Sequence, residues 1–287
     1  MRIRIDLAYD GTDFHGWAAQ PGLRTVQGDL EAALAVALRL PGVGVVCAGR
    51  TDTGVHARGQ VVHLDVDDAV VAGSAGRSQD PPLEALARRL NGILRPDVRV
   101  RRAAVAPPGF DARFSALWRR YAYRVADDPA TVDPLTRHHV LVWSKPLDLD
   151  AVNEAADLFL GEHDFASFCR RREGATTIRT LLDLTWVREP SGVAVATVRA
   201  DAFCHSMVRA LVGCLLAVGD GRRPVAWAGE VLRAAARDPS VTVAHAHGLT
   251  LEEVAYPADL ELAQRADLTR AKRVAPGSTG DEVDGDG

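Results

Sequence analysis

The first residues of the chain alternate between apolar and polar side chains, which indicates a strand buried on one face. The apolar positions of this strand are Ile3, Ile5, Leu7 and Tyr9. After a loop rich in glycine the period changes, and apolar residues recur every four positions at Val26, Leu30, Leu34 and Leu38. This spacing predicts a helix that Thr25 caps and that Pro41 and Gly42 end.

The same reasoning divides the rest of the chain into two successive α/β halves. In the first half we predict further strands over residues 43–48, 60–66 and 98–105 and a helix over 82–93. In the second half we predict strands over 119–126, 181–187, 193–201 and 254–256, and helices over 150–159, 203–219 and 231–235. Strands that follow one another in hairpins and also flank helices favour an α+β sandwich, with helices on one face of a mainly antiparallel sheet.

Length and composition agree with a globular protein of two parts. The chain has 287 residues, of which 47% are hydrophobic and 25% charged. We divide it into residues 1–108, which hold the first half, residues 109–265, which hold the second, and an acidic tail over 266–287 that we expect to be disordered. Residues 72–81 are rich in Gly, Ser and Pro, and we expect disorder there too.

Charge is unevenly distributed although the net charge is only −4. Between Arg88 and Arg124 there are ten arginines against two acidic residues, Asp97 and Asp111. A basic surface of this kind attracts phosphates, although a solvated face of the protein explains the same pattern.

Several classes of protein are not indicated. The four cysteines lack metal-binding or redox spacing, so we expect reduced core thiols in a cytoplasmic protein, with neither a disulfide nor zinc. The longest apolar stretch, residues 207–219, contains Arg209 and is too short to span a bilayer, and no signal peptide is visible. Scattered histidines and the absence of a P-loop or dinucleotide motif imply no metal and no cofactor.

The densest polar cluster is the loop over residues 49–60, between two apolar strands. It contains Asp52 with Arg50 and Arg58 on either side. A turn stabilised by Asp, Thr and Gly is the simplest interpretation of such a stretch. The Asp-Thr-Gly sequence also suggests an aspartic protease, but that chemistry needs two carboxylates that share a proton, whereas flanking arginines favour an ionised acid and no second Asp-Thr-Gly is present.

An ionised aspartate among arginines is suited to a substrate that carries phosphate. At a sugar carbon, a carboxylate stabilises the oxocarbenium character that develops when a glycosidic bond breaks, so a nucleoside is one candidate substrate. Arg120 and Tyr121 lie in a stretch of alternating basic and aromatic residues that can contact phosphates and stack on bases, although Tyr123 in the same stretch is better explained as core. Arg209, inside an apolar helix, either extends to solvent or reaches Asp52 across the two halves.

With these residues identified, the chain closely resembles the tRNA pseudouridine synthase A family over nearly its full length. The resemblance rests on ordered sequence blocks at residues 9–12, 16–17, 25–28, 49–56, 59–61, 110–115, 120–123, 161–165, 207–209 and 247–249. Gly49-Arg50-Thr51-Asp52 is the most specific of them. The chain departs from the usual pattern around Arg209, at Ser206 and Ala210, and residues 72–81 resemble an insertion.

The resemblance implies specific roles for site residues. Asp52 matches the catalytic aspartate, which opens the bond between uracil N1 and ribose C1′ either by attack on C1′ or by removal of a neighbouring proton. Tyr121 matches the tyrosine that stacks on the base, and Arg209 matches the basic partner of the aspartate. Substrate-binding roles are expected for Arg50, which positions the RNA or the loop, for Leu249 under the base, and for Arg58 and Arg120.

The resemblance also implies a fold, a substrate and an oligomeric state. It implies two ferredoxin-like (RRM-like) halves whose sheets join around a central active-site cleft, and a homodimer that binds tRNA across both subunits. The expected activity is that of a cofactor-free isomerase that converts uridine to pseudouridine at positions 38, 39 and 40 of the anticodon stem-loop, with the target base flipped out of its stack. An RNA-binding or RNA-chaperone protein that lost the reaction is the alternative.

Overall fold

The computed structural model describes residues 1–74, 79–170 and 176–270. Its strands are β1 (Arg2–Tyr9), β2 (Val46–Cys47), β3 (His56–Asp65), β4 (Val98–Val105), β5 (Trp118–Ala126), β6 (Leu141–Val142), β7 (Gly161–Asp164), β8 (Ile178–Arg188), β9 (Ala194–Ala200) and β10 (Leu249–Ala255). Its helices are α1 (Val26–Leu38), α2 (Asp68–Ser74), α3 (Pro82–Ile93), α4 (Leu149–Asp157), α5 (Met207–Gly219), α6 (Val225–Arg233) and α7 (Leu262–Arg270).

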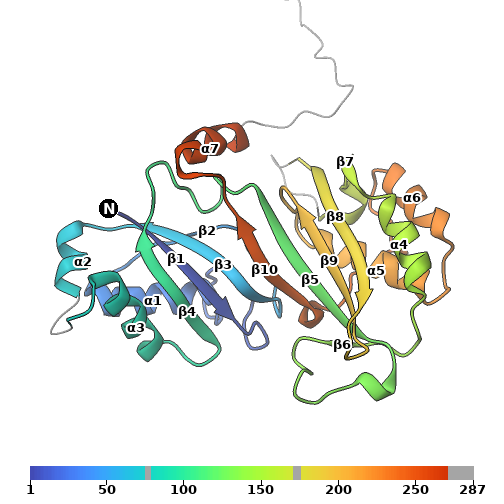
Figure 1. Ribbon diagram of the computed structural model, residues 1–287, viewed down its shortest axis with the longest axis horizontal. Helices are drawn as coiled ribbons and strands as arrows, with labels where there is room; N and C mark the ends of the chain where they lie inside the picture. Colours follow the sequence, from blue (N-terminus) through green and yellow to red (C-terminus); the bar gives the residue numbers. More distant parts are fainter. Residues whose placement is uncertain (75–78, 171–175, 271–287) are drawn as a thin grey trace, which may run out of the picture.

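All ten strands belong to one sheet that runs the length of the molecule (Figure 1). The order along the sheet is β4-β1-β3-β10-β5-β9-β8-β7, with β2 paired to β3 and β6 paired to β5. Among the strands of the described residues, only the pairs β3–β10 and β5–β6 are parallel. The predicted α+β class and the mainly antiparallel sheet are therefore confirmed.

The strand β10 joins the part of the sheet formed before residue 108 to the part formed after it. On one side it runs parallel to the start of β3, where Thr250 lies opposite His56. On the other side it runs antiparallel to β5, where Leu251 lies opposite Tyr121. As a result, the beginning of β3 and the middle of β5 are held one strand apart, although more than 60 residues separate them in sequence.

Amphipathic patterning accounts for the elements nearest the amino terminus. Alternate residues of β1 are buried, and in α1 the predicted apolar stripe faces the core. The backbone N–H of Gly28 donates to Thr25 Oγ1 at 3.2 Å, which confirms the predicted cap of α1. In the second half α4 packs on β8 and against α5 and α6. Within the described ranges, no helix combines the length and apolar character needed to cross a membrane.

Several predicted boundaries are wrong, each for a local reason. The strand predicted over 43–48 is reduced to the two residues of β2, because only these pair with β3. The helix predicted from residue 203 begins at Met207, since Ser206 has a left-handed backbone. The helix placed at 231–235 spans Val225–Arg233, and the strand placed at 254–256 starts at Leu249.

The segments expected to be disordered are in part helical. Residues 72–74 form the end of α2, where the side chains of Val71 and Ser74 are buried. Residues 266–270 belong to α7, and Ala266 is only 2% exposed. Packing of α7 against residues 109–117 explains this order, because Leu262 O accepts a hydrogen bond from Ser115 Oγ. Residues 79–81 lead directly into α3, with Pro81 at its N-cap. Residues 75–78 and 271–287 lie outside the described residues.

Candidate active site

The loop between β2 and β3 carries Asp52 and is fixed by the first half of the molecule. Tyr9 and Thr51 share a hydrogen bond between their hydroxyl groups at 2.8 Å. The fully buried amide of Gln60 donates to Gly49 O at 2.8 Å and to Tyr9 Oη at 3.3 Å. These bonds link two strands to the loop on both sides of Arg50, and so fix the backbone from which Asp52 projects.

A second glycine-containing loop supports the same segment. Trp17 N donates to Thr51 O at 3.0 Å. Gly16 has a φ of +88°, and a Cβ at this position would lie 3.0 Å from Thr51 O. Only glycine combines this left-handed backbone with so close an approach, which explains its place in the sequence.

The carboxylate of Asp52 meets three side chains from the second half. Oδ2 accepts from Arg209 Nη1 at 3.2 Å and from Ser206 Oγ at 3.1 Å. Oδ1 lies 3.4 Å from His205 Nε2. Arg209 is held in place because its Nε donates to Ala244 O at 2.7 Å. The contact between Asp52 and Arg209 that the sequence analysis considered is thus present, and about a quarter of each side chain remains exposed.

Tyr121 and Leu249 line a cavity of about 590 Å³ that Asp52 also borders. Tyr121 is 7% exposed, and its ring meets that of Phe203 edge to face at a centroid distance of 5.1 Å. Burial raises the pKa of the Tyr121 phenol well above its usual range. The wall of this cavity therefore holds a carboxylate beside a neutral aromatic ring.

A second cavity, of about 790 Å³, also borders Asp52. Arg50 and Arg170 line both cavities, and Arg237 lines the larger one. Within residues 1–74, 79–170 and 176–270, none of these three guanidinium groups has a carboxylate partner. Their positive charge is thus available to an anionic ligand. The same ranges contain no group of three or more His, Cys, Asp or Glu side chains arranged to hold a metal ion.

Comparison with known proteins identifies the chain. A family model described as tRNA pseudouridine synthase matches residues 155–257. The tRNA pseudouridine synthase A of Frankia casuarinae is 60% identical over 98% of this chain and 98% of its own length. The enzyme of the same name from Streptomyces griseus is 61% identical over 97% of this chain and 96% of its own. The chain belongs to the tRNA pseudouridine synthase A family. A more distant relative, from Mycobacterium leprae, is 52% identical over 95% of this chain and 96% of its own.

The structure brings together most residues that the pseudouridine synthase motifs single out. The side chains that line the smaller cavity include Arg50, Asp52, Tyr121, Arg209 and Leu249. Both halves contribute to this set, because Arg50 and Asp52 come from the loop between β2 and β3, whereas Tyr121 comes from β5 and Leu249 from β10.

Arg58 and Arg120 are the exceptions, since neither lines the two cavities. Arg58 pairs with Glu252 at 3.3 Å, and Arg120 pairs with Glu253 at 3.0 Å. Arg120 is absent from the cavity lining because of the pleat of β5. Adjacent residues of a strand point to opposite faces, and the neighbouring Tyr121 faces the cavity. The arginine-rich stretch is therefore not one basic surface.

Arg119, in the same stretch, is a structural residue. It is buried, and its guanidinium donates to three backbone carbonyls, those of Ala48, Arg113 and Asp201. These bonds join the segment before the Asp52 loop to β5 and to the end of β9. The charge of Arg119 is thus satisfied inside the protein.

The candidate site also includes Ser206, His205 and Arg170, which the sequence alone did not indicate. No metal spacing connects the histidines, and Arg170 stands in a stretch with no recognised motif. The available signal was proximity in sequence, because Ser206 lies one helical turn before Arg209 and a helix presents both on the same side.

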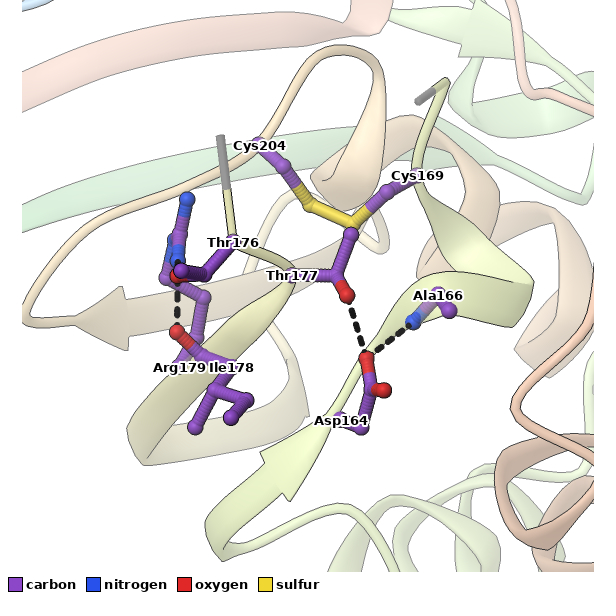
Figure 2. The surroundings of a disulfide bond; sticks show 8 residues. All are labelled: Asp164, Ala166, Cys169, Thr176, Thr177, Ile178, Arg179 and Cys204. Carbon is purple, nitrogen blue, oxygen red and sulfur yellow. Dashed lines mark hydrogen bonds between the residues drawn. A yellow bond between two sulfur atoms is a disulfide. The ribbon is translucent and has the colours of Figure 1, made fainter. Parts of the chain in front are cut away.

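The expectation of four reduced cysteines is wrong, because Cys169 and Cys204 form a disulfide (Figure 2). Their sequence separation of 35 gave no motif, but the fold brings the two Cα atoms to 5.7 Å. The bond links the segment after β7 to the loop before α5, where Arg170 N also donates to His205 O at 3.2 Å. Cys204 directly precedes His205, so the disulfide restrains the loop that contacts Asp52.

Cys47 and Cys214 are free and buried, as predicted for core thiols. Burial raises the pKa of the Cys47 thiol to about 11 and that of Cys214 to about 12. Both side chains therefore remain neutral thiols near pH 7.

Proposed function

We propose that this protein isomerises uridine to pseudouridine at positions 38, 39 and 40 of the tRNA anticodon stem-loop. The observation that carries this proposal is the contact between Asp52 and Arg209, at 3.2 Å, on the wall of a cavity that Tyr121 and Leu249 also line. The cavity, of about 590 Å³, has room for a flat base and its ribose. Family membership supplies tRNA as the substrate class.

The reaction is a rearrangement in which no electrons are gained or lost overall. The bond between uracil N1 and ribose C1′ breaks, and a bond between C5 and C1′ forms. The C5 proton leaves, and N1 takes up a proton. A carboxylate beside C1′ assists by stabilising positive charge on the sugar or by forming a bond to it. Removal of a neighbouring proton by Asp52 is the other route, and the position of the carboxylate is compatible with both.

Tyr121 is proposed to stack on the base that enters the cavity. The raised pKa of its buried phenol keeps the ring neutral, so it presents an aromatic face rather than a phenolate. Leu249 is only 5% exposed and offers an apolar surface to the same base. A base that leaves its stack exchanges contacts with neighbouring bases for contacts with these two side chains.

Phosphate binding is proposed for three cavity-lining arginines that have no carboxylate partner in the described part of the chain. Arg50, Arg170 and Arg237 lie around the two cavities that meet at Asp52. Arg58 and Arg120 pair with glutamates of β10, so a role in substrate binding requires RNA to compete with a carboxylate for each of them. We therefore place the RNA backbone along the first set.

The resemblance to the family also supports three proposals about the oligomeric state, the location and the fold. We infer that the enzyme is a homodimer, that it works in the cytoplasm where tRNA is matured, and that the two halves of the sheet are ferredoxin-like units with a central cleft. The central strand β10, which pairs with strands of both halves, supports the last of these.

The deciding experiment measures release of tritium from tRNA transcripts labelled at uridine C5. We expect release by the intact protein and none by Asp52→Asn, which removes the charge and keeps the shape of the side chain, while tRNA affinity changes by less than about threefold. Asp65→Asn, which alters an exposed acid at the end of β3, is the matched control and should retain full activity. Transcripts with a single uridine among positions 38, 39 and 40 then map the target.

Binding of tRNA without tritium release by the intact protein would contradict the proposal and favour the RNA-binding alternative. Full turnover by Asp52→Asn would leave the reaction in place but remove Asp52 from it.

A further inference from the structure

Ser206 has an unusual backbone at the start of α5. Its φ and ψ are 62° and 8°, in the left-handed region that residues with a Cβ rarely adopt. Serine at the first position before a helix normally accepts a hydrogen bond from a backbone N–H of the first turn. The Ser206 side chain makes no such bond. The Ser206 side chain therefore does not cap α5, and the backbone of Ser206 stays in an unfavourable conformation.

The hydroxyl group of Ser206 is directed to Asp52 instead. Oγ donates to Asp52 Oδ2 at 3.1 Å, and Arg209 Nη1 reaches the same oxygen at 3.2 Å. The backbone on both sides is held, because Ala210 N donates to Ser206 O at 2.9 Å and Cys204 is tied to Cys169. A left-handed conformation that costs free energy and serves no local bond is characteristic of functional sites.

We propose that Ser206 is a positioning residue for Asp52. Two donors on Oδ2 fix the rotation of the carboxylate. From the described residues Oδ1 has only the longer contact of 3.4 Å to His205, and it is left as the oxygen that faces the substrate. This inference rests on the proposed function, because it assigns a task to Asp52.

The test separates the hydroxyl group from the backbone strain by comparing Ser206→Gly with Ser206→Ala. Both remove the hydroxyl, but only glycine accepts the left-handed backbone without strain. We expect kcat for tritium release to fall about tenfold in both variants, with KM within about twofold of the unaltered protein, since one hydrogen bond to a charged group is lost. The Tm of Ser206→Gly should exceed that of Ser206→Ala.

Ala235→Gly is the matched control. Ala235 also has a positive φ, of 45°, and it lines neither cavity. This change relieves the same kind of strain and should leave kcat unchanged. An unaltered kcat in Ser206→Gly would overturn the proposal, because the role of Ser206 would then be confined to the backbone.

A double-mutant cycle keeps the inference testable even if the protein releases no tritium. Ser206→Gly and Asp52→Ala are combined, and the stability of each form is measured by denaturant unfolding. In the protein with Asp52, Ser206→Gly relieves backbone strain but also removes the hydrogen bond to Asp52. In the Asp52→Ala background that bond is already absent, so we expect Ser206→Gly to raise the free energy of unfolding by more there. Absence of coupling would overturn the assigned contact, whereas absence of tritium release with coupling present would overturn only the proposed function.

Discussion

At the scale of single residues, the charge of Asp52 is matched by a guanidinium group that reaches it from another part of the chain. Arg209 stands in a helix whose other buried residues are apolar, and its position is understandable only through its bonds to Asp52 and to Ala244 O. Its planar donor group holds both acceptors at once, which an ammonium group does less well.

Replacing Arg209 therefore tests how far the carboxylate depends on its partner. Arg209→Leu should lower kcat by about 100-fold, which corresponds to the loss of a charged hydrogen bond of about 3 kcal/mol. Arg209→Lys keeps the charge but lacks the planar guanidinium group. Its kcat should lie between that of Arg209→Leu and that of the unaltered protein. Single-turnover measurements on tRNA provide the rates, and equal rates for all three proteins would exclude this role.

The sequence predicted the residues of the site better than their partners. Asp52, Tyr121 and Leu249 stand in recognisable blocks, and the structure places all three on one cavity. Ser206 and His205 could not be assigned, because their contacts to Asp52 span more than 150 residues and depend on how the two halves meet. Arg120 lies apart from these residues for a simpler reason, since the pleat of β5 turns it away from Tyr121, and its role in substrate binding stays a prediction.

At the scale of elements, local patterning predicted α1 and β1, whose apolar residues have a regular period and whose surroundings are close in sequence. It failed for β10, which was recognised only in its last residues. Pairing of this strand with β3 and β5 is a long-range property, and its sequence alternates weakly because Glu252 and Glu253 interrupt it. The disulfide is a long-range feature of the same kind.

The disulfide between Cys169 and Cys204 leads to a prediction about stability. Without reductant, the denatured protein should expose two free thiols, and after reduction it should expose four. Cys169→Ser should lower the free energy of unfolding by about 4 kcal/mol, which is the chain-entropy value for a loop of this length. Denaturant unfolding with and without reductant measures the effect.

Reductant should have no further effect on the Cys169→Ser variant. An unaltered protein with four free thiols and no response to reductant would show that the pair stays reduced in solution.

At the scale of the whole molecule, we expect RNA to bind along Arg50, Arg170 and Arg237, three cavity-lining arginines that have no carboxylate partner among the described residues. Arg170→Ala should weaken tRNA binding and reduce the slope of log K against log salt by about 1, the loss of roughly one phosphate contact. Arg120→Ala is the matched comparison from the opposite face of β5, where Glu253 already neutralises the charge. Arg120→Ala should change this slope by much less than Arg170→Ala. A larger change for Arg120→Ala would indicate that RNA binds along the other face of β5.

The four tyrosines of the chain should make the stability of the fold depend on pH at high pH. They are Tyr9, Tyr121, Tyr123 and Tyr256. Burial raises the pKa of each phenol far above the ordinary value of 10.0. The unfolded chain therefore loses these protons first, and the folded state is destabilised as the pH rises above about 10. The slope should reach about 1.4 kcal/mol per pH unit for each tyrosine.

Unfolding followed by tyrosinate absorbance between pH 9 and 11.5 checks this expectation. Tyrosinate should appear together with the loss of folded structure. Titration of all four phenols in the folded protein near pH 10 would contradict it.

The position of β10 in the sheet also has a consequence for the order in which the enzyme is made. Its residues, 249–255, leave the ribosome after those of β3 and β5, and until they do the start of β3 and the middle of β5 have no strand between them. The loop with Asp52 is synthesised first, but its distance to Tyr121 is fixed only after β10 has been made. A chain that stops before β10 therefore lacks the strand that brings the two halves of the site together.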